Sequence, residues 1–355
     1  MLTTQGYAAF KSDGPLQPFT FDRREPGPFD VLINILYCGV CHSDIHTARS
    51  EWGPATYPVV PGHEIVGKVA RVGNQVNQFS VGDTVGVGCF LDSCRSCTAS
   101  VDGLEQYCQQ GPVFTYNSPG PDGRPTYGGY STRVVVDQKY VLRVPPSLPL
   151  ERTAPLLCAG ITTYSPLRHW NVGPSTRLGV MGLGWLGHMA VKLGVSMGAE
   201  VTVFSSSPSK EQEARRLGGH GFVLTSDENQ MKKQSGRMDL MLDTVSAVHP
   251  LEPYLSALRR DGTLVLVGAP SRPLNFQPFS IIGERKSIAG SLIGGIQETQ
   301  EMLNYCAQSN VAADVEVIPM ENINTAYDRI LAADVRYRFV IDIARSFQAV
   351  EIPQP

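Results

Sequence analysis

The chain has 355 residues, of which 42% are hydrophobic and 18% are charged, and its formal net charge is -3. This length exceeds what one hydrophobic core usually holds, so we expect two domains, and the composition argues against a disordered chain. Because there is no basic run, no apolar leader in residues 1–20 and no unbroken apolar span, we expect a cytoplasmic protein that binds neither nucleic acid nor membrane.

The first part of the chain is rich in predicted strands and turns. Short apolar runs at 31–37, 65–72 and 133–136 alternate with glycine, proline, asparagine and aspartate, which is typical of strands joined by tight turns. We therefore expect a mostly β domain over residues 1–154.

Three short segments carry potential metal ligands. Cys41 lies in Gly-Val-Cys-His-Ser-Asp-Ile-His, His63 lies in Pro-Gly-His-Glu-Ile-Val-Gly, and Cys158 follows more than ninety residues later. Catalytic zinc sites use three protein ligands and leave a fourth position open, and two cysteines with one histidine form such a set, known from alcohol dehydrogenase. Each residue alone is consistent with an ordinary buried side chain, but together they predict a catalytic zinc site.

Two acidic residues adjoin these ligands. Glu64 is close enough along the chain to bind the metal in alternation or to support a ligand. Asp44 is the natural partner of the free ring nitrogen of His63, because a carboxylate there fixes the tautomer of a ligating histidine.

Beyond residue 155 the pattern changes to apolar strands separated by helical stretches. Strands are predicted at 177–181, 200–204, 238–243 and 263–267, which is the rhythm of a doubly wound parallel sheet. The first strand leads into a glycine-rich loop and a helix, as in the Rossmann dinucleotide-binding fingerprint. A purely structural glycine turn is the alternative. The loop consists of Gly182, Leu183, Gly184, Trp185, Leu186 and Gly187.

The end of the second predicted strand indicates which dinucleotide binds. An NAD site places an acidic residue there, whereas this chain has Ser205, Ser206 and Ser207, with Lys210 close behind. Hydroxyls and an ammonium group can donate hydrogen bonds to a 2′-phosphate, so we expect NADPH as the cofactor. A solvated serine-rich turn is the alternative.

After residue 291 a predicted helix at 298–308 and a strand at 338–343 suggest a return to the first domain. The expected architecture is therefore α/β, with domain limits at 1–154, 155–290 and 291–355.

These motifs together resemble the zinc-dependent medium-chain dehydrogenase/reductase family, and more closely its cinnamyl alcohol dehydrogenase and broad-range aldehyde reductase branch. The resemblance covers essentially the whole chain, and segments 290–295 and 62–76 also carry it. It implies a GroES-like catalytic domain, a Rossmann NADP-binding domain and a homodimer. It also implies site residues: Cys41, His63, Cys158 and sometimes Glu64 for zinc; Ser43 and His46 for proton transfer; Ser205, Ser206 and Lys210 for the 2′-phosphate; Trp52 and Phe114 for the substrate pocket.

The resemblance fails at one position. The family carries a structural zinc lobe of four cysteines, to which Cys94, Cys97 and Cys108 correspond, but the third position is Ser100. A neutral hydroxyl is a much poorer zinc ligand than a thiolate. Three outcomes stay open: a zinc ion completed by Cys89, Asp92 or water, a metal-free lobe, and a disulfide.

The implied reaction is reversible hydride transfer between NADPH and an aromatic, cinnamyl-type or medium-chain aldehyde. One alternative is a zinc-independent reductase of conjugated alkenes or iminium groups on the same scaffold. Another, of a different class, is a redox sensor that binds NADPH without turnover.

Overall fold

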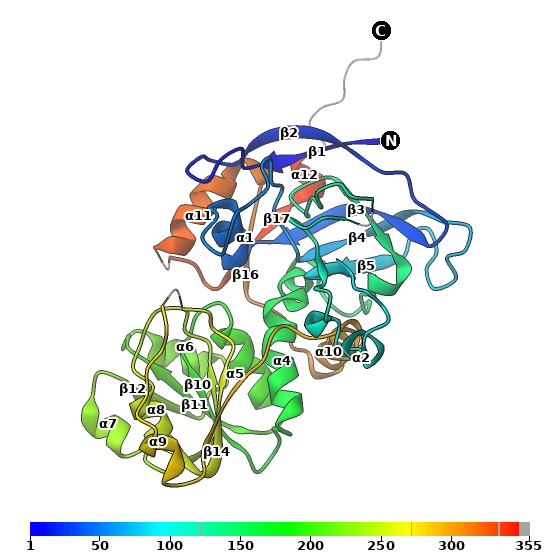
Figure 1. The fold of residues 1–355 in the computed structure, drawn as a ribbon. Coiled ribbons are helices and arrows are strands. Elements are labelled where there is room, and N and C mark those ends of the chain that lie inside the picture. The colour runs from blue at the N-terminus through cyan, green and yellow to red at the C-terminus, as the bar shows by residue number, and fades with distance from the viewer. Residues whose placement is uncertain (121, 271, 333, 348–355) are drawn as a thin grey trace. The chain divides into compact units, whose positions relative to one another are not determined.

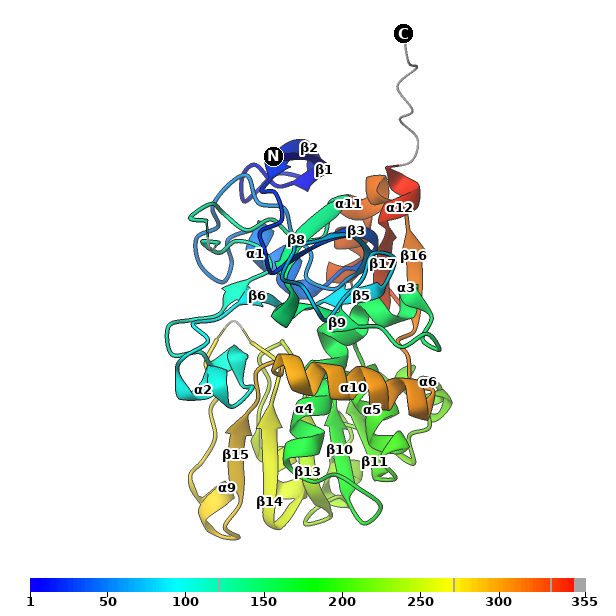
Figure 2. The same cartoon turned by 90° about the vertical axis from the view of Figure 1, so that its right-hand side faces the viewer.

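The computed structural model describes residues 1–120, 122–270, 272–332 and 334–347 (Figures 1 and 2). These residues form two compact units. The first comprises Met1–Cys158 together with the described residues from Gly294 onward, and the second comprises Ala159–Ile293. The limits expected from the sequence, 154/155 and 290/291, lie a few residues before these divisions and remain predictions. No helix among the described residues has the length and apolar character needed to cross a bilayer.

A seven-stranded sheet organises the first unit, with a strand order of β16, β17, β3, β4, β5 and β9, and with β8 also paired to β3. Most of its pairs are antiparallel, and β16 and β17 are parallel. The last part of the chain thus supplies two strands to a sheet that the first part begins. The strands are β3 (Asp30–Gly39), β4 (Ile65–Val72), β5 (Thr84–Val87), β8 (Arg133–Asp137), β9 (Leu142–Arg143), β16 (Val315–Ile318) and β17 (Arg338–Asp342).

Shorter elements surround this sheet. Two antiparallel ribbons, β1 with β2 and β6 with β7, lie outside it. Helix α11 buries one face, because Ile323, Ala326, Tyr327 and Ile330 recur at helical spacing. The elements are β1 (Leu2–Ala8), β2 (Gln17–Arg23), α1 (His42–Ala48), β6 (Phe90–Asp92), α2 (Thr98–Val101), β7 (Val113–Phe114), α3 (Leu150–Thr153), α10 (Ile296–Ser309), α11 (Ile323–Leu331) and α12 (Ile343–Ser346).

A six-stranded parallel sheet forms the core of the second unit, in the order β12, β11, β10, β13, β14, β15. Its inner strands are almost continuously apolar, as expected when helices cover both faces. The order reverses between β10 and β13, which makes the carboxyl end of β10 a topological switch point. The strands are β10 (Arg177–Met181), β11 (Glu200–Ser205), β12 (Gly221–Leu224), β13 (Met238–Asp243), β14 (Leu258–Leu266) and β15 (Ser287–Gly290).

A helix lies between each pair of consecutive strands of this sheet, as the crossover between parallel strands requires. Helix α5 packs on β10 and β11 and also contacts α4. Helices α6 and α7 pack near β12, and α8 packs on β14. The buried cluster between sheet and helices includes Met181, Phe204, Met241 and Leu255. The helices are α4 (Ala159–His169), α5 (Gly187–Ser196), α6 (Lys210–Arg216), α7 (Glu228–Lys232), α8 (Glu252–Ala257) and α9 (Phe279–Ile282).

The predicted α/β architecture, a mostly β part and a doubly wound parallel sheet, is confirmed. Two details differ from the expectation. The sheet gains the four-residue strands β12 and β15, which are too short to show a clear pattern. Strand β14 begins at Leu258, before the expected residue 263, because a register shift opposite Met238 admits the polar residues Arg259, Arg260 and Asp261.

Candidate metal centre and cofactor loop

Four predicted metal residues converge in the first unit. Cys41 is the N-cap residue of α1, His63 and Glu64 lie in the loop just before β4, and Cys158 follows a 3₁₀ turn. Their ligand atoms all lie within 4.8 Å of one another, and the Cys41 and Cys158 sulfurs are 3.9 Å apart. All four side chains are buried. Residues that are 117 positions apart in sequence therefore meet in one enclosed cluster.

The thiols of this cluster are electronically unequal. The hydrogen bond from Cys158 lowers the pKa of Cys41 well below its usual range, although burial opposes this. The hydrogen bonds of Cys41 and Cys89 raise the pKa of Cys158. One thiolate is thus already favoured, which is the form that binds metal.

Asp44 connects the segments that carry the predicted metal ligands. Its two carboxylate oxygens accept hydrogen bonds from the Cys41 and Gly62 amides at 2.8 and 3.1 Å and from the Tyr130 hydroxyl at 3.0 Å. His63 Nδ1 lies 3.1 Å from Asp44 Oδ1. Because a carboxylate only accepts, Nδ1 carries the proton and Nε2 is free to bind a metal. The distance between Asp44 and His63 is the one that the predicted role of Asp44 requires.

Glu64 is ion-paired with Arg338 of β17, and both side chains are fully buried. Burial raises the pKa of Glu64 to about 7, although Arg338 favours its charged form. The second carboxylate oxygen, Oε2, has no hydrogen-bond partner among the described residues. A buried oxygen left in this state beside two sulfurs and an imidazole is what a cation would satisfy, so the residues present fit a zinc ion.

The predicted proton-transfer residues lie on α1. Ser43 Oγ is 3.5 Å from Cys41 Sγ. His46 Nδ1 lies 2.5 Å from Glu51 Oε2, and the imidazole stacks on Trp52 with ring centroids 4.5 Å apart. Glu51 was not predicted from the sequence, because it lies beyond the end of α1 and its spacing of five residues from His46 is not that of neighbours on a helix. Trp52 is more than half exposed, as expected for an aromatic residue that a substrate could reach.

The structure does not join every predicted residue to this cluster. Phe114 lies on β7, where it pairs with Phe90, and its amide donates to Ser118 Oγ. Tyr116, two residues later, instead lies beside His63, with ring centroids 5.7 Å apart. The assignment of Phe114 to a substrate pocket therefore stays a prediction, and Tyr116 is a further aromatic neighbour that the sequence did not reveal.

The glycine-rich loop of the second unit follows β10 and leads into α5. Gly182 has a φ of +83°, which favours glycine. A Cβ at Gly187, the first residue of α5, would lie 2.1 Å from the Gly182 carbonyl oxygen, whereas one at Gly184 would have no heavy atom within 4 Å. The loop therefore uses two glycines for its own packing and leaves open space at the third, beside a helix N-terminus at the switch point of the sheet. This arrangement fits a dinucleotide pyrophosphate.

These different surroundings give opposite predictions for two matched substitutions. Gly187→Ala should lower the free energy of unfolding by about 2–3 kcal/mol, because the new methyl group collides with backbone. Gly184→Ala should leave the free energy of unfolding unchanged and weaken NADPH binding, because its methyl group occupies only the open space. Denaturant unfolding and fluorescence titration with NADPH measure the two quantities. Equal effects of both substitutions on unfolding would contradict this division of roles.

The other residues of the cofactor prediction lie at the ends of β10 and β11. Leu183 is buried, whereas Trp185 and Leu186 are half-buried. Ser205 ends β11, its hydroxyl accepts a hydrogen bond from the Ser207 amide at 3.2 Å, and Ser206 is exposed. Lys210 begins α6 directly afterwards. Hydroxyl groups and one ammonium group thus cluster at the position where an acidic residue would mark NAD.

Known proteins that resemble this chain include zinc-binding and NADP-dependent dehydrogenases, as the residues of the site predict. A model of the alcohol dehydrogenase GroES-like domain matches residues 27–146, and a model of the zinc-binding dehydrogenase family matches residues 186–308. The NADP-dependent alcohol dehydrogenase C of Mycobacterium bovis is 56% identical over 344 residues, which is 97% of this chain and 99% of that protein. The chain belongs to the zinc-dependent alcohol dehydrogenase family.

Solved structures place the dehydrogenase in the same group. A cinnamyl alcohol dehydrogenase from Sorghum bicolor is 48% identical and superposes with a TM-score of 0.95 over 98% of this chain and 100% of that one. The CAD of Helicobacter pylori, solved in complex with NADP(H), is 43% identical, with a TM-score of 0.92 over 98% of this chain and 99% of that one. The resemblance found in the motifs is thereby confirmed.

The second cysteine cluster of the dehydrogenase lies in the lobe around α2. The ligand atoms of Cys94, Cys97 and Cys108 lie within 4.8 Å of one another. The amides of Ser96 and Cys97 lower the pKa of Cys94 to about 5. Backbone amides that point at sulfur favour thiolates, so the lobe is preorganised for a cation.

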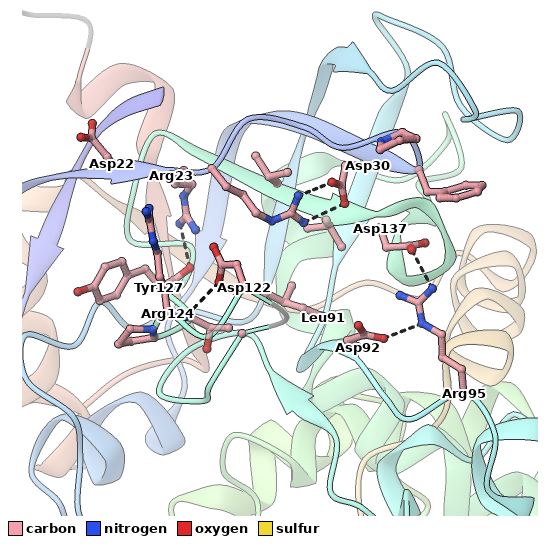
Figure 3. A pocket seen from close by; sticks show the side chains of 18 residues that line it. Asp22, Arg23, Asp30, Leu91, Asp92, Arg95, Asp122, Arg124, Tyr127 and Asp137 are labelled. Atoms are coloured by element: carbon pink, nitrogen blue, oxygen red, sulfur yellow. Dashed lines mark hydrogen bonds and ion pairs between the residues drawn. The ribbon is translucent and has the colours of Figure 1, made fainter. Parts of the chain in front are cut away.

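A separate cavity of about 480 Å³ lies in the first unit (Figure 3). Among the described residues its lining contains none of the metal ligands and neither Ser43 nor His46. Two of its arginines form ion pairs: Arg24 binds Asp30, and Arg95 binds Asp92 and Asp137 at 2.8 and 2.9 Å. Because the described residues that line the cavity include none of the predicted ligands or proton-transfer residues, we do not assign the active site to it.

Proposed function

We propose that this protein is an NADP-dependent, zinc-containing alcohol dehydrogenase of the cinnamyl type, which reversibly reduces aldehydes to alcohols. The observation that carries the proposal is the buried set of Cys41, His63 and Cys158, oriented through Asp44, in a chain that also has the NADP-type loop. Sequence identity of 56% with an NADP-dependent alcohol dehydrogenase over nearly the whole chain supports it independently.

Cys41, His63 and Cys158 would hold the zinc ion, with Glu64 as an occasional fourth ligand. Zinc bound by such a set supplies Lewis-acid polarisation of a carbonyl oxygen, and NADPH supplies the hydride. Asp44 keeps His63 in the tautomer whose Nε2 can bind the metal. Arg338 neutralises Glu64, so that the carboxylate can remain buried when it is not a ligand.

The chain itself supplies a proton to the substrate oxygen. Ser43, beside Cys41, is the hydroxyl donor in this proposal, and His46 restores its proton. The contact between Glu51 and His46 Nδ1 leaves Nε2 as the nitrogen that exchanges the proton, and the stack on Trp52 fixes the plane of the ring. Glu51 and Trp52 are thus positioning residues for His46, and Trp52 and Phe114 are the proposed aromatic walls of the substrate pocket.

For the cofactor, we propose that the backbone from Gly182 to Gly187 receives the pyrophosphate. Ser205, Ser206, Ser207 and Lys210 then bind the 2′-phosphate through charge-assisted hydrogen bonds. The crystal structure of the Helicobacter pylori relative in complex with NADP(H) is consistent with this preference.

Steady-state kinetics with NADPH and NADH over a panel of aromatic and medium-chain aldehydes test this function. We expect aldehyde-dependent oxidation of NADPH and a much lower kcat/KM with NADH. Oxidation of neither cofactor by any aldehyde would contradict the proposal and favour a binding protein without turnover.

We further propose a homodimer and a cytosolic location. Strand β15 ends the parallel sheet, with no partner on its outer side among the described residues, and Phe279 and Ile282 near it are 81% and 63% exposed. An open edge beside apolar side chains favours pairing with a second copy. All eight cysteines are free thiols, which suits a reducing compartment. The mass of the protein in solution tests the dimer.

A further inference from the structure

The lobe around α2 departs from a closed zinc site at one position, and the structure shows what stands there. Ser100 Oγ lies 3.2 Å from Cys97 Sγ and 3.7 Å from Cys94 Sγ. The third cysteine, Cys108, accepts a hydrogen bond from the Cys94 amide at 3.4 Å. The serine hydroxyl therefore lies among the sulfurs instead of pointing to solvent.

The part of the chain that the structure describes offers no other side chain to complete the set. Among the described residues no histidine, aspartate or glutamate atom joins the three cysteines within 4.8 Å. Asp92, the last residue of β6, forms an ion pair with Arg95 at 2.8 Å, and the same guanidinium group binds Asp137 (Figure 3). Cys89 lies beside Cys158, where its thiol contacts the Leu157 carbonyl.

The backbone of the lobe is arranged as if sulfur were charged. The Cys97 amide points at Cys94 Sγ at 3.3 Å, and the amides of Ser100 and Gln109 point at Cys97 Sγ at 3.4 and 3.5 Å. Hydrogen bonds of this kind compensate thiolates that bind a cation. The three cysteines are thus arranged to bind a metal as thiolates, and the Ser100 hydroxyl lies where a fourth ligand would be needed.

We propose that the lobe binds zinc through Cys94, Cys97 and Cys108, with the neutral Ser100 hydroxyl as the fourth donor, and that this ion is exchangeable. Three thiols lose their protons on binding and Ser100 keeps its proton, so the site carries one negative charge less than a site with four thiolates. A hydroxyl donates less charge to zinc than a thiolate, and water can replace it. The lobe ion should therefore leave the protein faster than an ion held by four sulfurs.

The test measures zinc, not catalysis. The full-length protein, prepared with saturating zinc and desalted, is analysed for zinc per chain, and the transfer of zinc to a chromogenic chelator is then followed in time. The comparison includes Ser100→Cys, which restores the fourth sulfur, Ser100→Ala, which removes the oxygen, and Ser96→Ala as a matched control. Ser96 is an exposed serine of the same lobe.

We expect two zinc ions per wild-type chain, one of which transfers in a separate fast phase. Ser100→Cys should slow this phase about tenfold or more, Ser100→Ala should accelerate it, and Ser96→Ala should leave it unchanged. Equal rates of zinc transfer in the fast phase of the wild type and of Ser100→Ala would show that Ser100 is not a ligand. One zinc ion per wild-type chain, or a mass two hydrogens lower through a disulfide in the lobe, would also overturn the proposal.

Discussion

Replacing His63 by alanine should abolish aldehyde reduction, with a loss in kcat/KM of about 10³-fold or more. Among the described residues, this imidazole is the only nitrogen ligand in the cluster with Cys41 and Cys158, and Asp44 accepts a hydrogen bond from its other nitrogen. Without it only the two sulfurs and the carboxylate of Glu64 remain, and that carboxylate is ion-paired with Arg338, so the three-ligand set of a catalytic zinc site is lost. Initial rates with saturating NADPH and an aromatic aldehyde measure the effect.

Two further measurements separate a lost metal from a lost fold. The affinity for NADPH should be unchanged, because the glycine-rich loop belongs to the other unit. Zinc content should fall by one ion per chain. Cys306→Ala is a suitable control, since this thiol is fully buried in α10 and takes no part in either cysteine cluster. If the His63 variant retained wild-type turnover, the metal centre would have to lie elsewhere.

The second large effect concerns the choice of cofactor. Ser206→Asp should raise the KM for NADPH about 10²-fold, because a carboxylate repels the 2′-phosphate and removes a charge-assisted hydrogen bond. The KM for NADH should fall, since an acidic side chain at the end of the second strand accepts hydrogen bonds from the ribose hydroxyls. The value of kcat at saturating NADPH should change little, because the interaction is equally strong in ground and transition states.

Ser235→Asp is the matched control for charge. Ser235 is also an exposed serine of the second unit, but it precedes β13 and therefore lies toward the amino end of the sheet. Both variants add one negative charge to the same unit. Equal changes in the KM for NADPH in the two variants would indicate a long-range effect of charge and would remove Ser206 from the binding site.

The metal ligands could be inferred from the sequence because short motifs with strict chemistry carry them. Cys41, His63 and Cys158 lie far apart in the chain, yet each has a distinctive local setting, and the structure brings the three together. The glycine loop was equally clear, since the strand before it and the helix after it frame the pattern. Local signals of this kind do not depend on knowing the tertiary fold.

Contacts between distant segments could not be inferred in this way. Arg338 pairs with Glu64, 274 positions away in the sequence, and no local sequence pattern around either residue predicts this ion pair. Tyr130 contacts Asp44 across 86 positions for the same reason. The start of β14 was missed because charged residues interrupt its apolar pattern. The sequence shows that Ser100 replaces the third cysteine of the family's pattern. Only the structure shows that its hydroxyl lies close to the sulfurs of Cys94 and Cys97.

Transfer of deuterium from NADPH labelled at C4 to cinnamaldehyde tests the central claim most directly. The aldehyde carbonyl and the conjugated double bond are both reducible, and the position of the label distinguishes them. We predict cinnamyl alcohol with deuterium on the carbinol carbon, formed by the wild type and not by the His63→Ala variant. Deuterium on the β-carbon of a saturated aldehyde, or labelled alcohol formed equally well without His63, would contradict this account.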